Sequence, residues 1–199
     1  MDFAPTSPGT RAGSITPTPL KILVAGGFGV GKTTMVSTLS EIPPLSTEQA
    51  ITELSEGVDD LSAVPDKRTT TVAMDFGRIT IDNSLILYLF GTPGQSRFWF
   101  MWDELASGAV GAVVLVDLRR IDDCFAAIDY FENRRLPFVV AVNGFPGNDE
   151  FGAEAVREAL VVDPDVPLIW TDARDVESGR ATLVSLVEHA LARAAATAA

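Results

Sequence analysis

The sequence predicts an α/β protein in which helices cover both faces of a mostly parallel sheet. Short apolar segments alternate along the chain with amphipathic ones, and this alternation is typical of strands joined by crossover helices. Several apolar segments are hydrophobic at every position, as strands buried on both faces are. The chain has 199 residues, of which 47% are hydrophobic, so it can form one domain with a sizeable core. We therefore expect three layers, αβα, built on about six strands with one antiparallel edge strand.

Five of the expected strands are short apolar runs. They cover residues 20–25, 85–90, 110–116, 138–142 and 168–170. The sixth, residues 72–81, alternates between apolar and polar up to Phe76 and then slips phase. Because a slip of one residue moves the side chains to the other face of a strand, we expect a bulge at Gly77 or an edge strand there.

The expected helices are amphipathic. Apolar residues share one face in the segments around Phe125 and Leu186, and a further helix is expected over residues 32–39. Residues 41–71 carry no strand pattern, although residues 47–61 could form a helical piece.

The two ends of the chain are expected to lie outside the folded domain. Residues 1–19 hold four of the twelve prolines together with Ser, Thr and Gly, and such a segment cannot bury enough surface to order itself. Residues 194–199 are Ala-rich and are expected to fray. The domain would then span residues 20–193.

The charge of the chain argues against some classes of partner. A net charge of −12 disfavours binding to nucleic acid and to anionic lipid, because both need a basic face. No segment has the pattern of a signal peptide or the length of a membrane span. We expect a cytoplasmic protein without direct membrane insertion, which partners could recruit to a membrane. The one cysteine, Cys124, is expected in the core, and the one histidine, His189, on a surface helix.

Residues 26–33, GGFGVGKT, have the pattern G-x-x-x-x-G-K-T after an apolar strand and before a helix. Glycines let backbone N–H groups turn inward around phosphate oxygens, and the helix amino terminus adds its unpaired N–H groups. Lys32 would reach the β and γ phosphates, and the Thr33 hydroxyl would ligate Mg²⁺. The sequence thus predicts a P-loop nucleotide-binding protein. The expected contacts are Gly26, Gly27, Phe28, Gly29, Val30, Gly31, Lys32, Thr33 and Thr34.

Three later stretches resemble the Ras-like small GTPases. They are the run TTTVAMDFG from Thr69, the run GTPGQ-x-RF from Gly91, and a strand that ends VAVN at Asn143. Together they are most similar to the bacterial conservon small GTPases, which resemble the polarity GTPases of gliding bacteria. The resemblance implies a GTP/GDP-binding switch that uses Mg²⁺ and acts in bacterial signal transduction. It also implies a roadblock-type protein partner and a sensor-kinase-like system.

The resemblance implies roles for residues around the phosphates. Thr71, with Thr70 as the second choice, would join Mg²⁺ and sense the γ-phosphate. Gly94 would hold the γ-phosphate through its N–H, and Gln95 would orient the attacking water. Gln95 and Lys32 are therefore the expected catalytic residues. The expected metal ligands are Thr33 and Thr71.

The base-reading part matches the family only in part. The expected base contacts are Asn143, Asp172, Ala173 and Arg174, with Ala173 offering its N–H. Gly144 and Pro146 replace the lysine and the aspartate of the family's base-reading motif, and neither side chain can accept hydrogen bonds from the guanine edge. Asp149, three residues on, is an alternative acceptor. Guanine preference is therefore expected to be weaker than in typical small GTPases.

Two further departures concern hydrolysis. Gly91 stands where the family usually has an aspartate that holds Mg²⁺ through water, and Phe28 stands where Ras has glycine. Binding can survive the loss at Gly91, because Thr33, the phosphates and water can complete the Mg²⁺ shell. We therefore expect slow intrinsic hydrolysis. Arg68 and Arg97 flank the two switch loops and could act in cis.

The sequence leaves three functions open. The first is a GTP-dependent switch with slow hydrolysis. The second is a pseudo-GTPase, an interaction module that binds nucleotide without turnover. The third is an enzyme that transfers a phosphoryl group to a substrate, but the acidic chain offers no arginine-rich lid for it.

Residues 98–102, FWFMW, are apolar without interruption. Since successive residues of a helix turn by about 100°, five such residues cover its whole circumference. Three of them are spaced for one face, which leaves Trp99 and Phe100 to another cover. Residues 41–71 could fold over them, or they could form a partner surface next to the γ-phosphate loop.

Overall fold

The structure is a computed structural model that describes residues 17–43, 45–52, 69–94, 101–146 and 151–198, with the backbone alone over 45–52 and 69–73. Its seven strands form one sheet in the order β2-β3-β4-β1-β5-β6-β7. In chain order the elements are β1 (Thr18–Gly26), α1 (Lys32–Leu39), β2 (Leu45–Thr52), β3 (Thr69–Thr80), β4 (Leu85–Gly91), α2 (Trp102–Ala106), β5 (Ala109–Val116), the 3-10 helix η2 (Leu118–Arg120), α3 (Asp122–Arg134), β6 (Phe138–Asn143), α4 (Ala153–Leu160), β7 (Leu168–Thr171) and α5 (Val176–Ala198).

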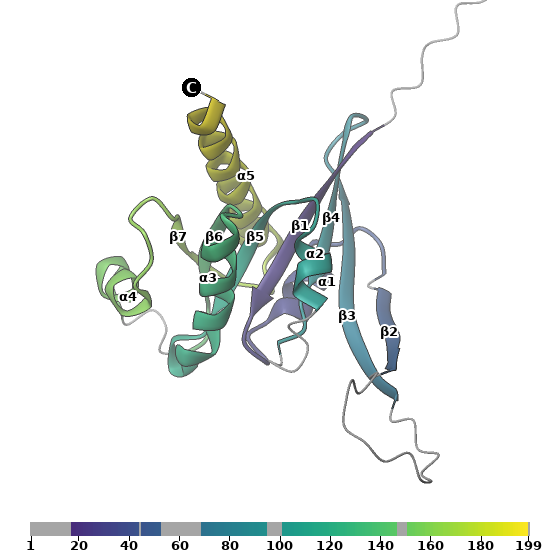
Figure 1. Ribbon diagram of the computed structural model, residues 1–199, viewed down its shortest axis with the longest axis horizontal. Helices are drawn as coiled ribbons and strands as arrows, with labels where there is room; N and C mark the ends of the chain where they lie inside the picture. The colour runs from purple at the N-terminus through teal and green to yellow at the C-terminus, as the bar shows by residue number, and fades with distance from the viewer. Residues whose placement is uncertain (1–16, 44, 53–68, 95–100, 147–150, 199) are drawn as a thin grey trace, which may run out of the picture.

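Helices cover both faces of the sheet (Figure 1). α1 and α5 pack on one face, and α2, α3 and α4 contribute to the core on the other. The buried strands supply alternate residues to the two sides. Along β5, Val113 and Leu115 face α1 and α5, while Val114 and Val116 face α3. β1 is parallel to β4 and β5, and β6 is parallel to β5 and β7. The expected three-layer α/β fold is confirmed.

The edge of the sheet differs from the expectation. β2 lies in the segment for which the sequence predicts no strand, and it pairs antiparallel with β3 from Leu45 opposite Phe76 to Thr52 opposite Thr69. The helical piece expected from residue 47 is therefore wrong over residues 47–52, and residues 53–61 lie outside the described residues. Pairing stabilises a strand such as LSTEQAIT even though its own sequence shows little alternation.

No bulge occurs at Gly77. The antiparallel register of β3 with β4 runs without a break through Phe76 opposite Phe90 and Gly77 opposite Leu89. The edge-strand expectation fits the second half of β3, because β2 stops opposite Phe76. α1 packs against this part of β3: a Cβ atom at Gly77 would lie 2.9 Å from Val36 Cγ1. Glycine is required here because a helix lies too close for a side chain.

Two residues of FWFMW belong to the core. Met101 and Trp102 are 7% and 3% exposed. The Trp102 ring lies 5.8 Å from Phe131 and 5.1 Å from Tyr130, so α2 is anchored on α3. Phe98, Trp99 and Phe100 lie outside the described residues, as do Gln95, Arg97, Arg68 and Asp149.

The ends of the domain lie slightly outside the expected bounds. β1 begins at Thr18, so residues 18 and 19 join the sheet, and α5 continues through the Ala-rich stretch to Ala198. Cys124 is buried in the core, as expected, and donates to the Ile121 carbonyl. Within the described ranges, no helix combines the length and the apolarity needed to cross a bilayer.

Candidate functional site

The predicted P-loop connects β1 to α1. Gly26, Gly29 and Gly31 have positive φ values of 129°, 73° and 108°, which explains why glycine is needed at these turns. Gly31 also precedes the first turn of α1 without any side-chain cap, so the first backbone N–H groups of the helix have no capping side chain. The carboxyl end of β1 therefore presents backbone donors and a helix amino terminus, which together suit a phosphate group.

Lys32 lies inside this loop. Its Nζ donates to the carbonyl oxygens of Gly26 at 2.9 Å and Gly27 at 2.6 Å. Burial lowers the pKa of Lys32 to about 8, although the negative charge of Asp75 acts in the opposite direction. Gly94 lies against the same group, because a Cβ atom at Gly94 would be 2.7 Å from Lys32 Nζ. The structure thus brings together Lys32 and Gly94.

A carboxylate that the sequence analysis missed completes this side of the site. Thr33 Oγ1 donates to Asp75 Oδ2 at 2.6 Å. Asp75 belongs to β3 and lies opposite Gly91 of β4. A Cβ atom at Gly91 would lie 3.0 Å from both Cβ and Oδ2 of Asp75. The Asp75 carboxylate therefore occupies the space that a side chain at position 91 would take.

A signal in the sequence could have found Asp75. The hairpin of β3 and β4 turns at residues 81–84, and Asp75 and Gly91 are each eight residues from Asn83. Counting the register outward from a short antiparallel turn would have placed the two opposite one another.

Thr33 and Asp75 fit a magnesium ion. A hydroxyl and a carboxylate are hard oxygen donors, which Mg²⁺ prefers. Among the described residues no group of three or more His, Cys, Asp or Glu side chains could hold a metal by itself. This suits Mg²⁺, which typically takes one or two protein ligands and fills its shell with phosphate oxygens and water.

The structure does not bring Thr71 to this pair. Thr71 lies within β3, opposite Ala50 of β2. It is four residues from Asp75 along an extended strand, a separation of roughly 13 Å. A role for Thr71 as a metal ligand stays a prediction.

Asn143 joins three loops. Its Nδ2 donates to the Val30 carbonyl of the P-loop at 2.9 Å. Its Oδ1 accepts from the backbone N–H groups of Gly144 and Ala173, both at 3.0 Å. The side chain is buried, so these bonds are shielded from water. The expected base-contacting residues after β6 and β7 therefore lie beside the P-loop.

The loop after β7 carries a closed ion pair. Asp172 Oδ1 accepts from the backbone N–H of Arg174 at 2.9 Å and from its Nε at 2.8 Å, and Oδ2 accepts from Nη2 at 2.8 Å. These bonds from Arg174 lower the pKa of Asp172 to about 2. A Cβ atom at Gly144 would lie 3.8 Å from Asp172 Cβ and 3.9 Å from its Cγ. The Asp172 side chain is thus next to the backbone of the loop after β6.

Two arginines of η2 follow the end of β5, and one of them contacts the P-loop. Arg120 donates to the Phe28 carbonyl, while the Phe28 side chain itself is 67% exposed. Arg119 pairs with the buried Asp117 at 2.7 Å and lies over the Phe145 ring. The pattern analysis did not single out these arginines.

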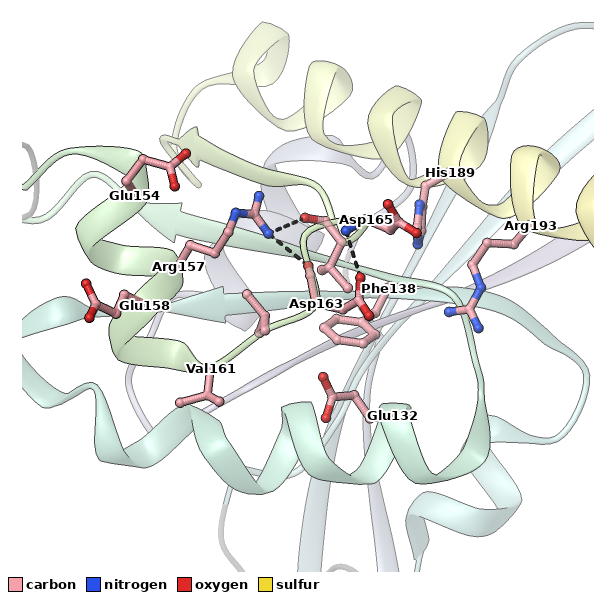
Figure 2. A pocket seen from close by; sticks show the side chains of 12 residues that line it. Glu132, Phe138, Glu154, Arg157, Glu158, Val161, Asp163, Asp165, His189 and Arg193 are labelled. Atoms are coloured by element: carbon pink, nitrogen blue, oxygen red, sulfur yellow. Dashed lines mark hydrogen bonds between the residues drawn. The ribbon is translucent and has the colours of Figure 1, made fainter.

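A separate cavity of about 940 Å³ lies at the opposite end of β6 from Asn143. Figure 2 shows Phe138 at its base, with Arg157 of α4 and His189 of α5 on its walls. Arg157 is held by the carbonyls of Asp163 and Val166. No residue of the P-loop lines this cavity, so it is not part of the phosphate site.

Comparisons with known proteins identify a family and a fold. A family described as conserved hypothetical ATP-binding proteins matches residues 24–193. An uncharacterized protein of Methanocaldococcus jannaschii is 30% identical over 126 residues, which make up 62% of this chain and 69% of that protein.

Solved structures of G domains share the fold. The G domain of the T. maritima FeoB iron transporter aligns with a TM-score of 0.61 at 16% identity, over 87% of this chain and 99% of that chain. The FeoB cytosolic domain of T. maritima in a GDP form gives 0.59 at 14% identity, over 87% and 64%. The FeoB G domain from Methanococcus jannaschii gives 0.57 at 12% identity, over 86% and 97%. Since the family match spans most of its length, the chain belongs to the conserved hypothetical ATP-binding proteins, as a P-loop nucleotide-binding protein with the fold of a G domain.

Proposed function

We propose that this protein is a GTP/GDP-binding molecular switch with slow intrinsic GTP hydrolysis. The observation that carries the proposal is the arrangement around the P-loop. The Lys32 amino group lies next to Gly94, and the Thr33 hydroxyl donates a hydrogen bond to the Asp75 carboxylate of the β3–β4 hairpin. The phosphates would be held by Lys32 and the backbone N–H groups, and Mg²⁺ by Thr33 and Asp75. When bound, the metal neutralises charge on the phosphate oxygens.

Slow hydrolysis follows from the surroundings of the terminal phosphate. Gln95 is the one water-orienting candidate in the sequence, and it follows directly on Gly94. Phe28 places a bulky exposed side chain on the adjacent turn of the P-loop. In related switches a supplied arginine is worth on the order of 10³ to 10⁵ in rate. The isolated protein would therefore hydrolyse GTP slowly until an activating partner binds.

The experiment measures bound nucleotide and turnover. The nucleotide released from denatured purified protein is identified, and binding of GTP, GDP, ATP and ADP is measured with and without Mg²⁺. Lys32→Ala is expected to weaken binding by roughly tenfold or more, because it removes the charge-assisted phosphate contact. Arg180→Ala, which removes an exposed cation on α5, serves as the matched control and should bind normally. Absence of binding to all four nucleotides would overturn the proposal.

A second candidate is a pseudo-GTPase, a module that binds nucleotide without turnover. It is favoured by Gly91 and Phe28, which depart from the pattern of active switches. Single-turnover conversion of GTP to GDP separates the two, because a slow but measurable rate supports the switch. Fast hydrolysis by the isolated protein would contradict both.

We also propose a nucleotide-dependent partner surface beside the γ-phosphate loop. Met101 is buried and Trp102 packs against Phe131 of α3, which supports an anchored α2. The aromatic residues that precede α2 follow Gly94 and Gln95 closely in the chain. By resemblance to the conservon GTPases, the partner is a roadblock-type protein in a system with a sensor-kinase-like protein. Trp99→Ala should lose partner binding alone, while Phe151→Ala, an exposed aromatic residue before α4, should not. Loss of folding in Trp99→Ala, or no change, would remove this surface.

A further inference from the structure

The nucleoside of a nucleotide held by the P-loop must lie near the loops after β6 and β7. In parallel sheets, ligands bind at the carboxyl ends of the strands. Asn143 bonds the Val30 carbonyl of the P-loop and the Ala173 N–H of the next loop, so the two loops lie directly beside the phosphate site. A base attached to the bound phosphates would meet Gly144 and residues 172–174 there.

A guanine base needs an acceptor at this place. Its edge presents the N1–H and the 2-amino group as donors, and an ionised carboxylate accepts from both. Adenine has no 2-amino group, and its N1 is an acceptor, so the same carboxylate would repel it. Pro146 stands where the Ras-like small GTPases, which this sequence resembles, carry the aspartate that reads the base. The side chain of proline cannot accept a hydrogen bond.

Among the described residues, three carboxylates closely follow the ends of the neighbouring strands, one after β5 and two after β7. Asp117 is buried and bonded to Arg119. Asp175 accepts from the Ser178 N–H at 2.7 Å and so begins α5. Asp172 is 38% exposed and lies next to the Gly144 backbone. Of the three, only Asp172 combines access to a ligand with the right position.

We propose that Asp172 reads the guanine base in place of the missing aspartate, by accepting from the N1–H and the 2-amino group. This inference rests on the proposed nucleotide binding. It makes the protein selective for guanine although its base-reading motif lacks the expected acceptor.

The bond with Arg174 is compatible with this role. Arg174 is 73% exposed, and exposed ion pairs contribute little to stability. The Arg174 guanidinium can therefore give up hydrogen bonds to the Asp172 carboxylate at small cost, and the base can then donate to the same oxygens. Until then Arg174 keeps Asp172 ionised and oriented, which is why the pKa of Asp172 lies at about 2.

The test compares bases in the wild type and in Asp172→Asn. Affinities are measured for GDP, ADP, inosine diphosphate, which lacks the 2-amino group, and xanthosine diphosphate, which carries an oxygen there. The wild type should prefer GDP over inosine diphosphate and ADP. In Asp172→Asn, GDP affinity should fall by roughly ten- to a hundredfold, because a charge-assisted pair is lost. Affinity for xanthosine diphosphate should rise relative to GDP, because the amide can donate to its oxygen.

Matched variants separate the outcomes. Asp175→Asn lies three residues on and keeps a good helix cap, so it should leave the base preference unchanged. Asp149→Asn tests the alternative acceptor after β6. Melting curves check folding, and Asp172→Ser gives a second variant with the same expected loss of GDP preference. Unchanged preference in both Asp172 variants, or loss of it in Asp149→Asn instead, overturns the inference while nucleotide binding stands. Failure of the wild type to bind any of the diphosphates overturns the proposed function as well.

Discussion

At the scale of single residues, the proposed phosphate site has a carboxylate beside it that comes from β3. Asp75 of β3 accepts a hydrogen bond from Thr33 of α1, and Gly91 of β4 leaves room for the Asp75 side chain. Adjacent antiparallel strands place opposite Cα atoms about 4.5 to 5.5 Å apart, so a side chain can act from either strand. A carboxylate at this place can therefore come from position 75 of β3 or from position 91 of β4.

We expect Asp75→Asn to weaken Mg²⁺-dependent nucleotide binding. The amide keeps the shape of the side chain but loses the charge that favours the metal. Loss of a residue that orients or supports a metal ligand typically costs roughly ten- to a hundredfold in metal affinity. The measurement is the GDP dissociation constant with Mg²⁺ and with a chelator, and the two values should converge in the variant.

The double variant Asp75→Gly, Gly91→Asp moves the carboxylate to the opposite strand. It should recover part of the Mg²⁺ dependence, whereas Gly91→Asp alone should destabilise the protein because its Cβ would lie 3.0 Å from Asp75. Full Mg²⁺ dependence in Asp75→Asn would show that Thr33, phosphate and water suffice.

Lys32 predicts a pH dependence of nucleotide affinity. Burial lowers the pKa of Lys32 to about 8 in the ligand-free protein, and bound phosphate would raise it again. Below this pH the lysine is charged in both states, so affinity should be flat. Above it, binding takes up a proton, and affinity should fall by up to roughly tenfold per pH unit. Dissociation constants between about pH 7 and 9.5 check this.

Lys32→Arg supplies the control for the pH profile. Arginine stays charged throughout this range, so whatever affinity remains should not fall with pH. A wild-type affinity that stays constant to about pH 9.5 would mean that Lys32 is fully charged before the nucleotide binds.

The sequence predicts the turn that joins β1 to α1 but not the carboxylate beside it, and the reason is distance along the chain. Gly26, Lys32 and Thr33 act through a local turn whose spacing is visible in eight consecutive residues. Asp75 is placed beside Gly91 by the register of β3 with β4, which the hydrophobic pattern of the sequence alone does not reveal. Gln95 and Asp149, two further predicted contributors, lie outside the described residues and stay predictions.

At the scale of elements, the position of α1 matters most, because its amino terminus would form the proposed phosphate site. α1 packs against the edge half of β3 through Gly77, where a Cβ atom would lie 2.9 Å from Val36 Cγ1 and 3.1 Å from Ser40 Cβ. This contact lies two residues from Asp75 along β3 and involves the helix that carries Lys32 and Thr33.

We expect Gly77→Ala to destabilise the protein by about 1–3 kcal/mol, the usual cost of overpacking. It should also weaken nucleotide binding, because α1 must shift away from β3. The free energy of unfolding from chemical denaturation is the measurement. Gly152→Ala is the control, since nothing lies within 4 Å of a Cβ atom there. Equal stability of the two variants would show that α1 can move without cost.

The elements that the sequence predicts best are those buried on both faces. β5 and β6 each agree with the expected apolar run to within one residue, because burial on both faces makes nearly every position apolar, Asn143 at the end of β6 being the exception. β2 is different. It lies at the edge of the sheet, its residues are mostly polar, and it depends on β3 for its hydrogen bonds. A strand of that kind has little signature of its own.

At the scale of the whole molecule, the nucleotide is expected to join parts that are far apart in the chain. Its phosphates would contact the loop after β1, and its base would contact loops after β6 and β7. Asn143 already links these loops through its bonds to Val30 and Ala173. Because the ligand would contact the folded state only, it should stabilise the entire domain.

We therefore expect a large thermal shift. Nucleotide at about 100 times its dissociation constant adds about 2.7 kcal/mol, which raises the melting temperature of a domain of this size by roughly 5–10 °C. The measurement is a melting curve with Mg²⁺ and GDP, and Lys32→Ala should show little or no shift. A shift of the same size in both proteins would place the binding elsewhere, with the cavity around Arg157 as the first place to look.

The contact between Asp75 and Gly91 also restricts the order in which mutations can accumulate. With Asp75 present, any side chain gained at position 91 meets an occupied space. A lineage of this protein would therefore gain an aspartate at position 91 most easily after Asp75 had been lost, and that intermediate would lack both carboxylates. Selection for metal binding would act against that intermediate. Selection would therefore tend to keep Asp75 and Gly91 together, because a change at either position alone is unfavourable.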